Sequence, residues 1–225
     1  MEVMQRKAKY NRRVSTALLY CGTAEGFVIG SDSRAFNRMT NQVETDKERK
    51  ICAFENSLAS VVFAWAGTVK ARTSYFDFSL LEESNDILSR VNFDTFAQDF
   101  NARLQDRLSS LRVTTTGECA RGVFLYFGKG AAMGFEMSVF KNGRTWDSCV
   151  TGGGMPTGEI FVISGGLEQV TFDKPASLSQ ATGMIDHYIR DCIADPRNEE
   201  IGGDVHIGKL TSEGFDWVIA PTVAG

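Results

Sequence analysis

The hydroxyl residues Ser15 and Thr16 stand side by side at the start of the first β-prone stretch, where either could serve as the nucleophile of a hydrolase. The chain has only two histidines, His187 and His206, so a mechanism with a histidine base must use one of them. We expect His187 on the polar face of a helix and His206 inside a strand, which favours structural or solvent-exposed roles for both. A hydroxyl at a freed chain terminus needs no histidine, because its own α-amino group, with a pKa of about 8, can accept the proton. A lysine that adjusts the local field and backbone amides that stabilise the oxyanion would complete such a site.

Other motifs do not indicate a different catalytic site. Ser164 is followed by two glycines, but Val162 stands where a nucleophile elbow requires glycine. The three glycines at 152–154 lack the lysine and the spacing of a phosphate loop, so we expect a turn there. The carboxylate pairs at 82–83 and 199–200 are expected on solvated surface.

The cysteines indicate neither a metal site nor a disulfide framework. There are five of them, widely scattered, and none has the short paired spacing of a zinc site. Reduced thiols in a cytoplasm are the simplest interpretation, and we expect no metal and no other cofactor.

Length and charge exclude several classes of protein. A chain of 225 residues fits one domain of ordinary to large size. The net charge is −4 and the basic residues form no long block, so we expect no nucleic-acid partner. The longest apolar run, residues 59–67, is about half of the roughly 20 residues that span a bilayer, so we expect no membrane segment. The N-terminus also lacks the apolar core of a signal peptide.

The first half of the sequence predicts strands followed by helices. After a polar and basic segment at residues 1–13, we expect a hairpin of strands 16–21 and 26–31, and a second of strands 51–54 and 58–66. A helix is expected at about 68–88. Another is expected over 93–111, where apolar residues recur at helical spacing.

The second half returns to strands, with one helix among them. Strands are expected at 122–127, 134–140, 144–148 and 159–163, with Asn142-Gly143 as a hairpin turn. A helix follows at 178–194, with one apolar face, and strands 204–210 and 215–219 end the chain. Segregated runs of strands and helices favour an α+β fold of layered antiparallel sheets covered by helices.

Five segments resemble one known family, and they occur in its order. Residues 26–35 (GFVIGSDSRA) closely resemble the second strand of proteasome subunits. Residues 50–58, 64–67 (AWAG), 163–166 (ISGG) and 201–205 (IGGDV) resemble further motifs of those subunits. The resemblance covers roughly residues 15–220. It implies the N-terminal-nucleophile (Ntn) hydrolase fold, a four-layer αββα sandwich, in a subunit of the 20S proteasome type.

The resemblance also implies roles for individual residues. Counting back from the aspartate places the family's nucleophilic threonine on Thr16, and an extra residue in the loop at 22–25 would place it on Ser15 instead. Lys47 is a less favoured substitute for the lysine beside the nucleophile. The implied roles are Thr16 as nucleophile, Asp32 as carboxylate, Lys50 as the lysine, Gly67 as the oxyanion-hole amide, and Ser164 and Asp195 as an outer polar cluster.

The implied activity is threonine-type hydrolysis of peptide or amide bonds through an acyl-enzyme. Residues 1–15 would form a basic arm or propeptide removed by self-cleavage after Ser15, and residues 16–225 a single domain. The implied partners are a peptide or protein substrate and further copies or related subunits in a ring.

Two alternatives remain open. The run Val14-Ser15-Thr16-Ala17 also resembles non-catalytic, alpha-type subunits that keep an N-terminal arm, and Ser15 stands where catalytic subunits usually have glycine. A small-molecule amidase of the same fold would share the nucleophile and differ in pocket size.

Overall fold

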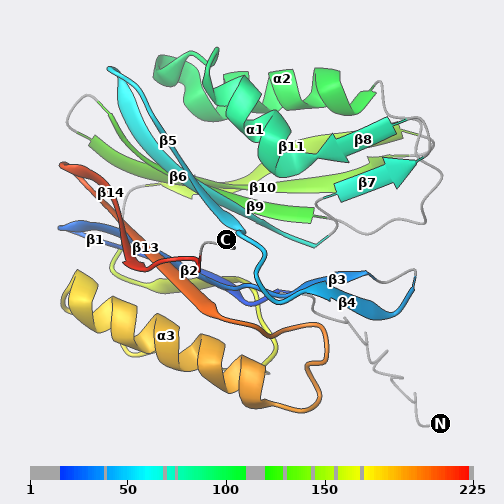
Figure 1. The fold of residues 1–225 in the computed structure, drawn as a ribbon. Coiled ribbons are helices and arrows are strands. Elements are labelled where there is room, and N and C mark those ends of the chain that lie inside the picture. The colour runs from blue at the N-terminus through cyan, green and yellow to red at the C-terminus, as the bar shows by residue number, and fades with distance from the viewer. Residues whose placement is uncertain are drawn as a thin grey trace, which may run out of the picture.

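Two five-stranded antiparallel sheets form the centre of the structure, and helices cover the outer face of each (Figure 1). The computed structural model describes residues 16–37, 40–67, 70–73, 76–109, 120–128, 131–142, 145–154, 157–167 and 170–222. The first sheet contains, in spatial order, β12 (Ile160–Ser164), β1 (Leu18–Thr23), β2 (Gly26–Asp32), β13 (Val205–Thr211) and β14 (Gly214–Ile219). The second contains β11 (Thr145–Gly154), β10 (Ala131–Asn142), β9 (Ala120–Gly128), β6 (Ala59–Ala66) and β5 (Ile51–Glu55).

The described residues form three α-helices. Helices α1 (Leu80–Leu88) and α2 (Phe96–Ser109), with a short 3₁₀ turn at Phe93–Thr95 between them, pack on the second sheet, whereas α3 (Leu178–Ala194) packs on the first. Figure 1 shows α1 and α2 on one side of the molecule and α3 on the other, with the sheets between them. The predicted α+β class with antiparallel sheets is therefore confirmed.

Strand alternation explains how the two sheets face each other. In β6, Phe63 and Trp65 contact the helices α1 and α2, while Val62 and Ala64 belong to the core between the sheets. In β2, Ile29 also faces that core, and the neighbouring Val28 faces α3. Both faces of β6 and most of β2 are apolar, as expected when successive side chains point to opposite sides of a sheet covered on both faces.

The predicted helix at 68–88 is wrong in its first half. The chain instead forms a small hairpin of β7 (Lys70–Thr73) and β8 (Phe76–Ser79) before α1. The sequence between 73 and 78 contains Thr, Tyr and two Phe, which favour strands. Helix α1 begins where Ser79 can cap it, with the Ser79 hydroxyl accepting a hydrogen bond from the backbone N–H of Glu82.

The predicted turn at glycines 152–154 is wrong. These residues form the end of β11 and pair with β10. A Cβ on Gly153 would lie 3.2 Å from the carbonyl oxygen of Gly134 and from Cβ of Phe135, so a side chain there would press tightly against β10. A further hairpin, β3 (Ala35–Asn37) with β4 (Gln42–Thr45), was not predicted.

Other expectations agree with the structure or fall outside its described part. Helix α3 has the predicted bounds, and the hairpins β1–β2, β5–β6 and β13–β14 lie where predicted, with ends that differ by one or two residues. Ser15, the basic segment before it and residues 110–119 lie outside the described residues. Within the described ranges, no helix combines the length and apolar character needed to cross a membrane.

Candidate functional site

Asp32, the last residue of β2, is fully buried, and backbone amides hold its carboxylate. Oδ1 accepts a hydrogen bond from the N–H of Ala17 at 2.9 Å, and Oδ2 accepts from the N–H groups of Arg34 at 3.2 Å and Gly202 at 3.1 Å. These three donors come from segments far apart in the sequence. The carboxylate therefore has a fixed orientation before any ligand binds.

Lys50, directly before β5, connects this carboxylate to Thr16. Its Nζ lies 2.8 Å from Oδ1 of Asp32 and donates to the Thr16 hydroxyl at 3.2 Å. Lys50 is 7% exposed and Thr16 is 4% exposed. The structure thus brings together three predicted site residues, which we call the Thr16–Asp32–Lys50 cluster.

Burial lowers the pKa of the Lys50 ammonium below its ordinary value of 10.5, although the Asp32 carboxylate acts in the opposite direction. A lysine with a lowered pKa is neutral over more of the accessible pH range, and only the neutral amine can accept a proton. The role of Lys50 beside the nucleophile stays a prediction.

Arg34 secures the loop that ends at Lys50. Its guanidinium forms a two-pronged ion pair with Asp46, through Nε at 2.6 Å and Nη2 at 3.2 Å. Nη1 donates to the carbonyl oxygen of Glu199 at 2.9 Å, so Arg34 also connects this loop to the segment that follows α3. Two prongs fix the guanidinium plane more firmly than a single contact would.

Gly203 allows that same segment to approach. Its φ of +75° lies in the left-handed region, and a Cβ here would come 2.4 Å from both the Asp46 carbonyl oxygen and the Ser33 hydroxyl. The Ser33 hydroxyl donates to the carbonyl oxygen of Asp46 and accepts from the N–H of Asp204 at 2.7 Å. The segments 32–34 and 201–204 therefore hydrogen-bond to each other next to the cluster. Asp32 and Gly202, which form one of these bonds, are 170 residues apart in the sequence.

Ser164 and Gly67 lie at strand ends. Ser164 ends β12 directly opposite Leu18, two residues after Thr16. Gly67 follows β6 with a φ of +98°. Ala66, the residue before it, lies in the core between the sheets together with Leu18. The predicted roles of Ser164 and Gly67 stay predictions.

Asp195 and Lys47 have other surroundings. Asp195 follows α3, and its carboxylate accepts from the Arg197 guanidinium at 2.5 Å and from the backbone N–H of Arg197 at 3.0 Å. These two bonds hold the pKa of Asp195 at about 2. The contacts described for this carboxylate are with its own turn, and its membership of an outer cluster stays a prediction. Lys47 is exposed, and Lys50 occupies the place beside Thr16.

A small cavity of about 170 Å³ is lined in part by Arg121, Glu136, Ser138 and Ile163. Arg121 is paired across the sheet with Ala66, and Ile163 directly precedes Ser164. The cavity therefore lies close to the strand ends that carry Gly67 and Ser164, and Thr16, Asp32 and Lys50 do not line it. No group of three or more side chains that could hold a metal ion occurs among the residues that the structure describes.

Sequence reasoning missed the supporting residues. The motif Asp32-Ser33-Arg34 indicates a role for Asp32 only, and the sequence indicates none for Asp46. The signal is nevertheless present in the motif itself, because Ser33 and Arg34 contact the other recognised glycine motif and the residues just before it.

Comparison with known proteins gives a fold relationship. No family model matches the chain, and no curated protein matches it. Solved structures of Anbu proteins do resemble it. Anbu from Hyphomicrobium sp. strain MC1 has a TM-score of 0.60 and 13% identity over 90% of this chain and 84% of that one. Anbu (ancestral beta-subunit) from Yersinia bercovieri has a TM-score of 0.55 and 12% identity over 90% and 87%. The helical assembly of the Anbu complex from Pseudomonas aeruginosa has a TM-score of 0.55 and 15% identity over 92% and 88%.

These neighbours correct the predicted family. Anbu proteins are proteasome-like but form a distinct family, so the expectation of a 20S-type proteasome subunit is wrong. At this level of identity the likeness shows the fold, and the function must be argued from the site.

Proposed function

We propose that this protein is a proteasome-like hydrolase in which Thr16, once released as an N-terminal residue, attacks peptide or amide bonds. The observation that carries the proposal is the buried contact of Lys50 Nζ with the Thr16 hydroxyl at 3.2 Å and with Asp32 at 2.8 Å. A hydroxyl, a lysine with a lowered pKa and an oriented carboxylate are the groups that such a nucleophile requires.

In the proposed reaction, the Thr16 oxygen attacks the substrate carbonyl while its proton passes to the neutral Lys50 amine or to the freed α-amino group. Asp32 stabilises the ammonium that forms. The Gly67 N–H is proposed to stabilise the oxyanion. Collapse of the tetrahedral intermediate expels the amine, which takes a proton, and leaves an ester on Thr16. Water then hydrolyses this ester and restores the hydroxyl.

The architecture supports this proposal. Two facing sheets with α1 and α2 on one side and α3 on the other are compatible with the four-layer αββα arrangement of Ntn hydrolases.

We further propose that the chain assembles with copies of itself, as the Anbu complex from Pseudomonas aeruginosa does in its helical assembly. Mass photometry of the purified protein measures this directly. A species of several subunits is expected, and a monomer at all accessible concentrations contradicts it.

Intact-mass measurement and a covalent probe test the catalytic proposal. We expect a mature chain that begins at Thr16 and gains the mass of one threonine-directed electrophile, with Thr16→Ala blocking both processing and labelling. A chain that keeps its first residues, hydrolyses nothing and takes up no electrophile would indicate a non-catalytic structural subunit. Full hydrolytic activity in an unprocessed chain would contradict the Thr16 mechanism directly.

A further inference from the structure

Two buried polar atoms near the Thr16–Asp32–Lys50 cluster have no hydrogen-bond partner in the described structure. They are Oγ of Ser31 and Nδ1 of His206. Ser31 is fully buried and His206 is 1% exposed. A buried polar atom without a partner costs about 1–3 kcal/mol, so two adjacent examples require an explanation.

The two atoms belong to the same place in the fold. Ser31 on β2 and His206 on β13 lie directly opposite each other in the first sheet. Alternation along β2 places Ser31 on the same face as Ile29, which belongs to the core between the sheets, and alternation along β13 places His206 on the face of Leu210, in the same core. Residues directly opposite on antiparallel strands have Cβ atoms about 5 Å apart. Both polar atoms therefore lie in one small volume between the sheets.

Lys50 lies near these two residues and has one N–H donor beyond those that Thr16 and Asp32 accept. Ser31 is the residue before Asp32, to which Lys50 is paired, and the charge of Lys50 acts on His206. An ammonium has three N–H donors, and the described acceptors of Lys50 are Thr16 and Asp32. One donor thus remains for a third acceptor.

We propose that Lys50 Nζ, Ser31 Oγ and His206 Nδ1 bind one buried water molecule, and that this water orients the Lys50 amine toward Thr16. Buried waters make about three hydrogen bonds to otherwise unsatisfied polar groups, and these three atoms supply that number. The water accepts from Lys50 and donates to His206 Nδ1, while Ser31 Oγ accepts from or donates to it. The role of the water rests on the proposed function, whereas its presence does not.

The geometry of nitrogen explains what the water does. In the neutral amine, one N–H is directed at Asp32 and the other at the water. The lone pair then occupies the remaining tetrahedral position, toward the Thr16 hydroxyl. When Lys50 takes the proton, that position becomes the N–H that donates to Thr16. The water therefore keeps Lys50 in one orientation through both protonation states, which makes Ser31 and His206 positioning residues.

His206 must be neutral at Nδ1 to accept from the water. Burial lowers its pKa, and the charged groups that act on it are Asp204 and Asp32, which raise the pKa, and Lys50 and Arg49, which lower it. The Trp217 ring also packs on it, with centroids 6.4 Å apart. The surroundings as a whole favour the neutral ring.

Thermal unfolding of the full chain tests for the water, because the direction in which Ser31→Ala shifts the unfolding midpoint differs with and without it. If the two atoms are truly unpaired, Ser31→Ala removes an unsatisfied hydroxyl and leaves the unfolding midpoint unchanged or higher. If they bind a water, Ser31→Ala lowers the midpoint by about 2–4 °C. Ser84→Ala is the matched control, because Ser84 is a buried serine that donates to the Leu80 carbonyl and accepts from Trp65 Nε1.

A high-resolution crystal structure tests the same point independently. We expect an ordered water within about 3 Å of Lys50 Nζ, Ser31 Oγ and His206 Nδ1. A direct hydrogen bond between Ser31 and His206, or a dry contact between them, overturns the proposal.

Kinetics test the role of the water in positioning Lys50. His206→Leu, which removes the acceptor, should lower kcat roughly tenfold with little change in KM, and His206→Asn, whose amide oxygen can replace Nδ1, should restore kcat. Equal loss in both variants overturns the positioning role. The wild-type chain could show no hydrolysis while the ordered water and the shift in unfolding midpoint are both found. In that case the proposed function fails and the water site stands.

Discussion

Lys50 has an uncommon environment for a lysine, since only 7% of it is exposed and its ammonium contacts only groups of the candidate site among its described partners. Removing it leaves the Asp32 carboxylate buried without its cation, which costs about 3–5 kcal/mol. The informative substitution is therefore one that keeps the charge.

We predict that Lys50→Arg folds but loses at least about 100-fold in hydrolysis, because a guanidinium can pair with Asp32 but cannot be deprotonated to accept a proton. Lys50→Ala should lose the same activity with a lower unfolding midpoint. Circular dichroism establishes folding, and peptide hydrolysis measures the loss. Turnover close to wild type in Lys50→Arg would remove Lys50 from the role of base.

A second prediction at this scale concerns pH and His206. Its folded pKa is below the ordinary value of 6.5, so the unfolded chain binds the proton more readily than the folded one. Its contribution to stability is therefore complete above pH 6.5 and is lost as the pH falls toward the folded pKa.

We expect the loss of stability below pH 6.5 to be smaller in His206→Asn than in the wild type, measured as urea midpoints across that range. His187→Asn is the control, because His187 is exposed on α3 and pairs only with Asp191 in the contacts described. Identical pH dependence in the wild type and His206→Asn would contradict the assignment.

At the scale of elements, the segment between α3 and β13 supports the cluster through hydrogen bonds to Asp32 and Arg34. Two glycines that differ in backbone conformation and in the space around them test this role. Gly203 has a φ of +75° and no room for a Cβ, whereas Gly183 lies inside α3, where a Cβ would have nothing within 4 Å. The same substitution should therefore have opposite effects.

We predict that Gly203→Ala destabilises the protein by about 1–3 kcal/mol and lowers hydrolysis further than stability alone explains, because Ser33 and Asp46 must move. Gly183→Ala should stabilise by up to about 1 kcal/mol through helix propensity, with activity unchanged. Chemical denaturation and peptide hydrolysis measure both. Equal effects of the two substitutions would mean that the segment has no special role at the site.

The elements that could be predicted best are those with a complete local signal. Helix α3 begins at the Ser177 cap and has a continuous apolar face, so its bounds could be predicted. The hairpin of β7 and β8 could not, because the apolar residues after 67 also fit a helical period. The glycines at 152–154 favour a turn in the sequence because nothing local reveals the close approach of β10.

The candidate site was predictable only through its motifs. Thr16, Asp32 and Lys50 lie up to 34 positions apart, and no periodicity brings them together. The resemblance of residues 26–35 and 50–58 to a known family implied their roles, with Thr16 placed by its spacing from Asp32. The supporting contacts of Arg34 with Asp46 and the chain after α3 depend on tertiary packing, which a single sequence does not display.

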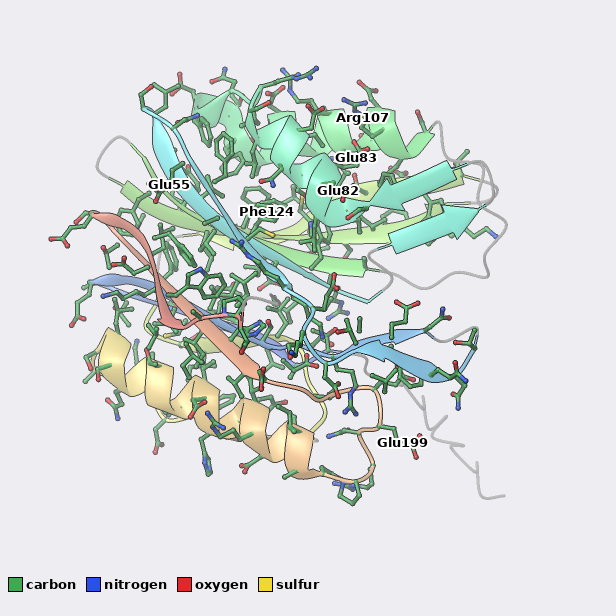
Figure 2. All side chains as sticks on the ribbon, viewed as in Figure 1. Glu55, Glu82, Glu83, Arg107, Phe124 and Glu199 are labelled. Carbon is green, nitrogen blue, oxygen red and sulfur yellow. The ribbon has the colours of Figure 1, made fainter. Side chains whose placement is uncertain are left out.

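At the scale of the whole molecule, the core beneath α1 and α2 and the candidate site lie in different layers. Phe124, labelled in Figure 2, lies fully buried on β9 and belongs to the core beneath α1 and α2. Its ring centroid lies 4.4 Å from that of Phe100, 5.0 Å from that of Phe135 and 5.4 Å from that of Phe63. The Thr16–Asp32–Lys50 cluster instead involves the first sheet and the start of β5.

We predict that Phe124→Ala costs about 3–5 kcal/mol of unfolding free energy, while the fraction that remains folded keeps its kcat. Phe124→Leu, which retains most of the volume, should cost less. Denaturant unfolding and active-site titration measure the two quantities separately. A large loss of kcat per folded molecule would show that the two layers are coupled.

The burial of the first strand determines when the proposed cleavage can occur. Thr16 is 4% exposed, Ala17 and Leu18 are fully buried, and the N–H of Ala17 is bound by Asp32. A separate protease needs an accessible, extended segment on both sides of the bond that it cuts, and the folded chain does not offer one after Ser15. Under the proposed function, maturation is therefore unimolecular. Its rate should be independent of precursor concentration and insensitive to added proteases, and an unfolded precursor should never become active.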